Sequence, residues 1–145
     1  MTTFNTLILM KELGIGTIAF ASSSAIYGDL GDKGLREDVG PLFPISNYGA
    51  MKLSSEAAIS AALESYLDVA FLFRFPNVIG IPATHGVIQD FIRKLKATPG
   101  NLDVLGDGTQ QKSYLHVDEL ISAMLFPLRL FVSLVPNFWA QCVTT

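Results

Sequence analysis

The sequence has few of the residues that build metal sites, disulfides and nucleic-acid-binding surfaces. It contains one cysteine, Cys142, which excludes an intrachain disulfide, and two histidines, which leave no Cys/His set for structural zinc. Its net charge is −3, and its lysines and arginines form no cluster. Because phosphate backbones are bound by concentrated positive charge, nucleic acid is not an expected partner, and no metal is expected either.

Export signals and long hydrophobic runs are also lacking. The N-terminus has no basic segment followed by a long apolar one, so no signal peptide is predicted. The apolar stretch 120–135 contains Pro127 and Arg129 and is shorter than the roughly 20 residues of a membrane span. We expect a buried helix there, followed by an atypical tail. These absences favour a reduced, cytoplasmic setting without membrane contact.

Half of the 145 residues are apolar and only 16% are charged, so the chain can build a hydrophobic core. Periodicity and turn residues predict helices at 4–12, 47–66 and 86–96, and a last one that begins near Glu119 after a cap at Asp118. The predicted strands are 17–21, 68–75, and a pair at 102–105 and 113–116 around a turn. The alternation of helices and apolar strands favours an α/β fold with parallel strands.

The second helix is expected to bury a face of small apolar side chains. These are Ala50, Leu53, Ala57, Ala58, Ala61 and Ala62.

Polar residues follow two of the predicted strands at their carboxyl ends. Three serines, Ser22, Ser23 and Ser24, come after the first strand, and Phe75, Pro76 and Asn77 come at the end of the second. Ligands of parallel α/β sheets lie outside the carboxyl ends of the strands. We therefore expect both stretches at one edge of the sheet, unless the serines only cap a turn.

Tyr48 and Lys52 lie four residues apart on the second predicted helix and share a face. A tyrosine is a poor base at neutral pH, but a neighbouring ammonium favours its phenolate. Such a pair can take a proton from an alcohol while a serine hydroxyl holds that alcohol in place. The alternative is a packed tyrosine beside a solvated lysine, since this spacing also occurs by chance.

The combination of motifs is more specific than either motif alone. The segments FASSSAIYGD, PISNYGAMK, FRFPNVIG and LGDGTQQKSYLHVDEL follow one another in this order. Over residues 4–126 the chain resembles extended short-chain dehydrogenases, and more narrowly the NAD-dependent epimerase/dehydratase family that acts on nucleotide sugars, as UDP-glucose 4-epimerases do. The resemblance implies a partial Rossmann-like, doubly wound parallel sheet with part of a small substrate-binding subdomain. It also implies NAD as the cofactor, a nucleotide-sugar substrate and a homodimer.

The resemblance assigns catalytic roles to three residues. Tyr48 matches the base, and Lys52 matches the lysine that binds the nicotinamide ribose. The catalytic serine of the family lies four residues before a tyrosine, here Tyr27, so that Ser23 matches and Ser24 is the alternative.

Further residues match the cofactor and substrate contacts of the family. Ala21, Ser22, Phe75 and Pro76 match positions that line the cofactor, together with Tyr48 and Lys52. Ser23, Ser24, Asn77, Val87 and Lys112 match positions that contact the substrate. Many members have a diphosphate-binding arginine where this chain has Lys112, which offers a point charge and no bidentate fork. The other interpretation of Lys112 is a solvated surface residue.

The family's 4,6-dehydratases have Asp and Glu after their catalytic threonine, and this chain has Ser24 and Ala25 there. Alanine has no proton to give, so that the sequence favours an epimerase. The other hypotheses are a nucleotide-sugar reductase, dehydratase or decarboxylase of the same family, and a non-catalytic remnant.

A complete family member begins with a strand and a Gly-rich turn that approaches the dinucleotide phosphates. The segment GIGTIAF at 14–20 precedes a strand and does not follow one, so it fails this test. We therefore expect a chain truncated at its N-terminus that binds NAD weakly by itself. The expected parts are a partial NAD-binding domain at 1–82, a partial substrate-binding region at 83–126 and an atypical tail at 127–145.

Overall fold

The computed structural model describes residues 2–31, 34–83, 86–109 and 111–134. It divides into two compact units, Met1–Pro76 and Asn77–Thr145, and the division falls six residues before the expected boundary at residue 82. Most of the atypical tail, including Trp139 and Cys142, lies outside the described residues.

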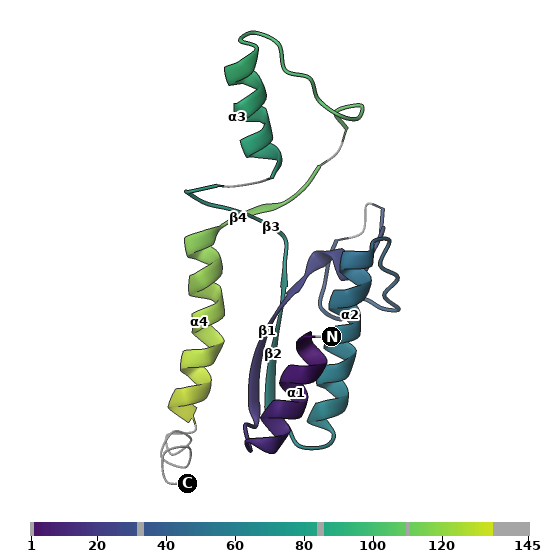
Figure 1. Cartoon of the computed structure of the whole chain (residues 1–145), viewed down its shortest axis with the longest axis vertical. Coiled ribbons are helices and arrows are strands. Elements are labelled where there is room, and N and C mark those ends of the chain that lie inside the picture. The colour runs from purple at the N-terminus through teal and green to yellow at the C-terminus, as the bar shows by residue number, and fades with distance from the viewer. Residues whose placement is uncertain (1, 32–33, 84–85, 110, 135–145) are drawn as a thin grey trace. The chain divides into compact units, whose positions relative to one another are not determined.

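Unit 1 is an α/β layer, as the sequence predicts (Figure 1). Its helices are α1 (Thr2–Glu12) and α2 (Asn47–Leu63), its strands are β1 (Thr17–Ser23) and β2 (Val69–Phe75), and a short 3₁₀ helix, η1, covers Ser24–Tyr27. The two strands pair in parallel, and the register places Thr17 opposite Val69 and Ser23 opposite Phe75. Their carboxyl ends therefore meet at one edge of the sheet, which confirms the expected placement of Ser23 and Phe75.

The core of unit 1 lies between the helices and one face of the sheet. Leu7 and Met10 of α1 pack with Ile59 and Ala62 of α2 and with Leu67. Ile18, Phe20 and Ala70 contact this cluster from the sheet. Since side chains alternate along a strand, the residues between them belong to the other face.

The predicted alanine-rich face of α2 is wrong in part. Ala50, Ala57 and Ala61 are exposed, whereas the buried positions are Gly49, Glu56, Ile59 and Ala62. The buried stripe is rotated from the predicted face because Glu56 is paired inside the unit, which the apolar pattern does not reveal.

Unit 2 contains β3 (Asn77–Ile79), α3 (Val87–Ala97), β4 (Tyr114–His116) and α4 (Val117–Leu134). β4 pairs in parallel with β3, and residues 102–105 form no strand, so that the predicted pairing of 102–105 with 113–116 is wrong. A local turn signal favoured a hairpin, but the partner of β4 lies far away in the sequence.

The last helix also differs from its prediction. α4 begins at Val117, which places Asp118 inside its first turn and not at the cap. It passes through Pro127 and has no buried residue in its described part, so the expectation of a buried helix is wrong. Among the described residues we find no helix with the length and apolarity that a membrane crossing requires.

Candidate active site

The carboxyl end of β1 carries the serine cluster. Ser22 and Ser23 are the last residues of the strand, which extends two residues beyond its predicted end, and Ser24 opens η1. The Ser23 hydroxyl oxygen accepts a hydrogen bond from the Ala25 amide at 3.2 Å and so caps η1. Accepting this bond leaves the Ser23 O–H available as a donor.

The first turn of α2 lies against η1. Ser46 caps the helix by accepting a hydrogen bond from the Gly49 amide at 3.0 Å. Gly49 is buried, and a Cβ there would collide with the Ala25 carbonyl oxygen and come within 3.0 Å of the Pro44 Cβ. A residue without a side chain thus lets the helix approach the segment that follows Ser23.

Tyr48 and Lys52 occupy the first two turns of α2, as predicted. Tyr48 is 57% exposed. The Lys52 ammonium donates a 2.6 Å hydrogen bond to the Ala21 carbonyl and lies 4.9 Å from the Phe20 ring centroid. It is also 5.7 Å from the centroid of the Tyr48 ring, a cation–π distance. Lys52 therefore joins the tyrosine of α2 to the end of β1.

The residues expected to line the cofactor range from exposed to buried. Ala21 is exposed and pairs in register with Phe73, and Phe75 is half-buried opposite Ser23. Pro76 follows directly and is also half-buried. Ser22 is 3% exposed, and its hydroxyl has no hydrogen-bond partner in the part of the chain that the structure describes.

These positions can be tested against the shape of a nicotinamide nucleotide. The exposed Tyr48, the Lys52 ammonium and the exposed Ala21 lie together at a strand end, which fits a polar ring and its ribose. A Gly-rich turn for the phosphates is not in the sequence. The residues of unit 1 therefore fit the nicotinamide half of the cofactor.

The expected substrate contacts beyond the serines belong to unit 2. The Asn77 side-chain amide donates to the Ser113 carbonyl at 3.2 Å, which places Asn77 beside the chain neighbour of Lys112. Both Asn77 and Lys112 are exposed. Val87 is the first residue of α3 and is 42% exposed. The structure thus brings Asn77 next to Ser113, the neighbour of Lys112, although the two segments are far apart in the sequence, and it leaves Val87 on a separate element.

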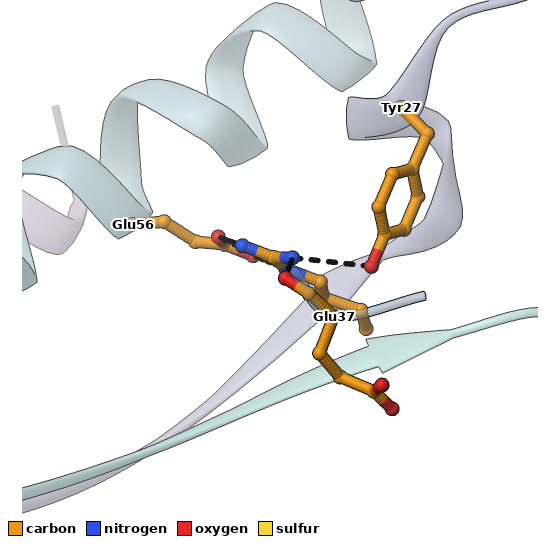
Figure 2. A network of polar contacts seen from close by, with 4 residues as sticks. Tyr27, Glu37 and Glu56 are labelled. Carbon is orange, nitrogen blue, oxygen red and sulfur yellow. Dashed lines mark hydrogen bonds and ion pairs between the residues drawn. The ribbon is translucent and has the colours of Figure 1, made fainter. Parts of the chain in front are cut away.

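Unit 1 contains a buried ionic network that the sequence patterns do not reveal. Arg74 of β2 donates to the Glu56 carboxylate from Nε at 3.2 Å and from Nη2 at 2.8 Å. Its Nη1 donates to the Tyr27 hydroxyl at 3.1 Å and to the Glu37 carbonyl at 3.0 Å (Figure 2). The hydrogen bond to Glu56 raises the pKa of the Arg74 guanidinium above its ordinary value, with Tyr27 adding to the effect. An arginine inside an otherwise apolar strand was the signal that could have revealed this network.

No group of three or more histidine, cysteine, aspartate or glutamate side chains in the described part of the chain could hold a metal ion.

Comparison with known proteins gives these elements a context. The sequence model of the NAD dependent epimerase/dehydratase family matches residues 1–137. The UDP-glucose 4-epimerase of Azospirillum brasilense is 30% identical over 87% of this chain and 41% of its own length. The crystal structure of a UDP-galactose 4-epimerase matches 90% of this chain and 42% of its own, with 37% identity and a TM-score of 0.79.

A third similar protein is MoeE5, solved in complex with UDP-glucose and NAD. It is 30% identical, with a TM-score of 0.73 over 85% of this chain and 41% of its own. The chain therefore spans 41–42% of the length of these three relatives.

Proposed function

Because the chain belongs to the NAD dependent epimerase/dehydratase family, we propose that it serves the epimerisation of a nucleotide sugar by transient oxidation at the sugar C4. The observation that carries this proposal is the Lys52 ammonium, which bonds the carbonyl at the end of β1 and lies over the Tyr48 ring. That arrangement puts a proton acceptor, a positive charge and a strand-end serine on adjoining elements.

Each of the three residues has a defined task in this proposal. The Ser23 O–H donates to the C4 hydroxyl oxygen and holds it, while its own oxygen remains bonded to the Ala25 amide. Tyr48 accepts the hydroxyl proton at its phenol oxygen. In this proposal Tyr48 reacts as its phenolate, whose negative charge the Lys52 ammonium stabilises before the proton arrives. NAD, when bound, would supply the hydride acceptor at C4 and the hydride donor for the reverse transfer.

The nucleotide would be held by the remaining expected contacts. Ala21, Ser22, Phe75 and Pro76 serve the cofactor in this proposal. Ser24, Asn77, Val87 and Lys112 serve the sugar nucleotide, with Lys112 providing a single positive charge for the diphosphate. UDP is the favoured nucleotide, because the relatives include epimerases of UDP-glucose and UDP-galactose.

Ala25 favours epimerisation over 4,6-dehydration. The position offers no proton for the removal of water, and its backbone is committed to the hydrogen bond with Ser23 and to contact with Gly49. A related nucleotide-sugar reductase, dehydratase or decarboxylase is the second candidate, because the family includes dehydratases as well as epimerases. A non-catalytic remnant is the third.

We further propose a homodimer and a cytoplasmic setting. Phe4 and Ile8 of α1 and Met51 of α2 are large apolar side chains that are 46–66% exposed. α1 and α2 lie next to each other, since Thr3 and Ser55 share a 3.0 Å hydrogen bond. A second copy packed on these helices would cover their apolar surface. Sedimentation should give a dimer mass, and Met51→Glu should give a monomer.

The activity is tested by product analysis with the 145-residue chain, UDP-glucose and NAD at millimolar concentration, since weak NAD binding is expected. The proposal predicts conversion to UDP-galactose without net formation of NADH. A 4-keto-6-deoxy product would identify a dehydratase, and accumulating NADH would identify a dehydrogenase. If the chain binds NAD in calorimetry but converts no UDP-glucose, the result would contradict the epimerase proposal and favour a non-catalytic remnant.

A further inference from the structure

The network around Arg74 joins the segments that carry the proposed catalytic residues of unit 1. Glu56 lies one helical turn after Lys52 on α2. Tyr27 ends the short helix that Ser23 caps. Arg74 pairs in register with Ser22 and directly precedes Phe75. One guanidinium therefore ties α2, η1 and the end of β2 together, and it also holds the loop at Glu37 (Figure 2).

The network is largely shielded from water. The Glu56 side chain is 6% exposed and that of Arg74 is 21% exposed, while Tyr27 is buried. A buried ion pair loses hydration, so that it contributes less to stability than its short contacts suggest. What it supplies well is geometry, because a guanidinium is a planar fork whose N–H groups point in fixed directions.

The Arg74 guanidinium is placed so that these fixed N–H directions reach two different elements. Two edges of the guanidinium face different elements: Nε and Nη2 bind the Glu56 carboxylate, and Nη1 binds the Tyr27 hydroxyl. The Arg74 guanidinium also lies 5.3 Å from the Tyr27 ring centroid. The distance between α2 and η1 is thereby set on one side by this fork, and on the other by the contact of Gly49 with the Ala25 carbonyl.

We propose that Arg74, Glu56 and Tyr27 are positioning residues that hold Tyr48 and Lys52 of α2 in place against Ser23. The inference rests on the proposed function for its catalytic part, since none of the three side chains is expected to touch substrate or cofactor. It also has a structural part that can be measured without any activity, because loss of the fork should loosen η1 from the first turn of α2.

Tyr27→Phe is the sharpest variant, because it removes one hydroxyl and keeps the buried ring. Tyr66→Phe is a matched control. Tyr66 also donates a part-buried hydrogen bond, to the Leu7 carbonyl at 2.7 Å, but it lies at the opposite end of α2. Arg74→Lys keeps the charge and removes the fork, so it separates geometry from charge.

The structural readout is hydrogen exchange of the Gly49 amide, which is buried beneath η1 and bonded to Ser46. Loss of one hydrogen bond should speed this exchange about tenfold in Tyr27→Phe and more in Arg74→Lys. Tyr66→Phe should leave it unchanged. Unchanged exchange in Tyr27→Phe, or an equal rise in Tyr66→Phe, would overturn the positioning role.

The catalytic readout is the split between kcat and KM for the nucleotide sugar. Small misplacement of catalytic groups lowers the rate of the chemical step, so kcat should fall about tenfold in Tyr27→Phe while KM stays unchanged. Faster Gly49 exchange with an unchanged kcat would make the network purely structural and overturn the proposal. If the wild-type chain converts no nucleotide sugar, the proposed function fails, and the Gly49 comparison still decides the structural part.

Discussion

The two units of this chain differ in how deeply their charged side chains are buried. Unit 1 buries Glu56 with Arg74 and fixes Lys52 on a backbone carbonyl, and its helices share a core. Unit 2 has no buried residue in the described parts of α3 and α4, and its ion pair Arg93–Asp90 joins side chains that are 78% and 32% exposed. The residues proposed for chemistry lie in the first unit, and the proposed diphosphate contacts lie in the second.

We infer from this difference that unit 1 places its functional groups precisely, whereas unit 2 can bind with looser geometry. Proton transfer requires groups placed within a fraction of an ångström, which a packed core can enforce. Diphosphate contacts act through charge and tolerate looser placement.

Tyr48→Phe should reduce kcat for epimerisation by about 10²–10⁴-fold, because it removes the proposed proton acceptor. The fold should be unaffected, since Tyr48 is 57% exposed. Tyr114→Phe is the matched control in unit 2, where Tyr114 is 41% exposed. Steady-state kinetics and circular dichroism of the three proteins decide the point, and similar kcat values in all of them would remove Tyr48 from the mechanism.

Glu56→Ala should destabilise the chain by about 3–5 kcal/mol, because it leaves the largely buried Arg74 charge without its partner. Glu56→Gln keeps an acceptor and should lose less. Arg93→Ala, which breaks an exposed pair of unit 2, should leave stability unchanged. Urea denaturation measures the free energy of unfolding of all three variants. Equal losses for Glu56→Ala and Arg93→Ala would contradict the difference between the units.

Gly49→Ala should destabilise unit 1 by about 1–3 kcal/mol through overpacking against Ala25 and Pro44. Helix propensity alone predicts the opposite sign, since alanine favours a helix over glycine. Gly34→Ala is the control, because a Cβ there meets no atom within 4 Å. A Gly49→Ala variant that melts at or above the wild-type temperature would show that the approach of α2 to η1 is loose.

The smallest effect concerns pH in unit 2. Hydrogen bonds from Lys94 and then Arg93 hold the pKa of the Asp90 carboxyl below its ordinary 3.8. A lowered pKa in the folded state means that the carboxylate supports α3 at neutral pH and loses that role as pH falls below 3.8. An NMR titration of Asp90 should therefore show a midpoint below 3.8 that rises in Lys94→Met. A midpoint at or above 3.8 would contradict the contacts.

The parts of the fold that follow from local pattern could be predicted from the sequence. Apolar runs bounded by turn residues located β1 and β2, and their parallel pairing followed from the helix between them. The partner of β4 could not be found in this way. A glycine-rich turn at 106–108 favoured a hairpin, whereas the strand that pairs with β4 is more than thirty residues earlier.

In the candidate site, the placement of Tyr48 and Lys52 could also be predicted from local pattern. The spacing of Tyr48 and Lys52 placed both on one helix face, and the cation–π distance agrees with that placement. The ionic network was not predictable from these patterns, because charged residues are exposed in most proteins and nothing in the helical pattern marks Glu56 as buried. Its burial depends on Arg74, which lies on another element.

The most direct test of the account follows the hydrogen at the sugar C4. UDP-glucose carrying deuterium at C4 is incubated with the 145-residue chain and NAD, and the UDP-galactose formed is examined by mass spectrometry. Transient oxidation at C4 predicts that the product retains the deuterium and that NADH does not accumulate. Loss of the deuterium to solvent, or its transfer to accumulating NADH, would contradict the proposed function.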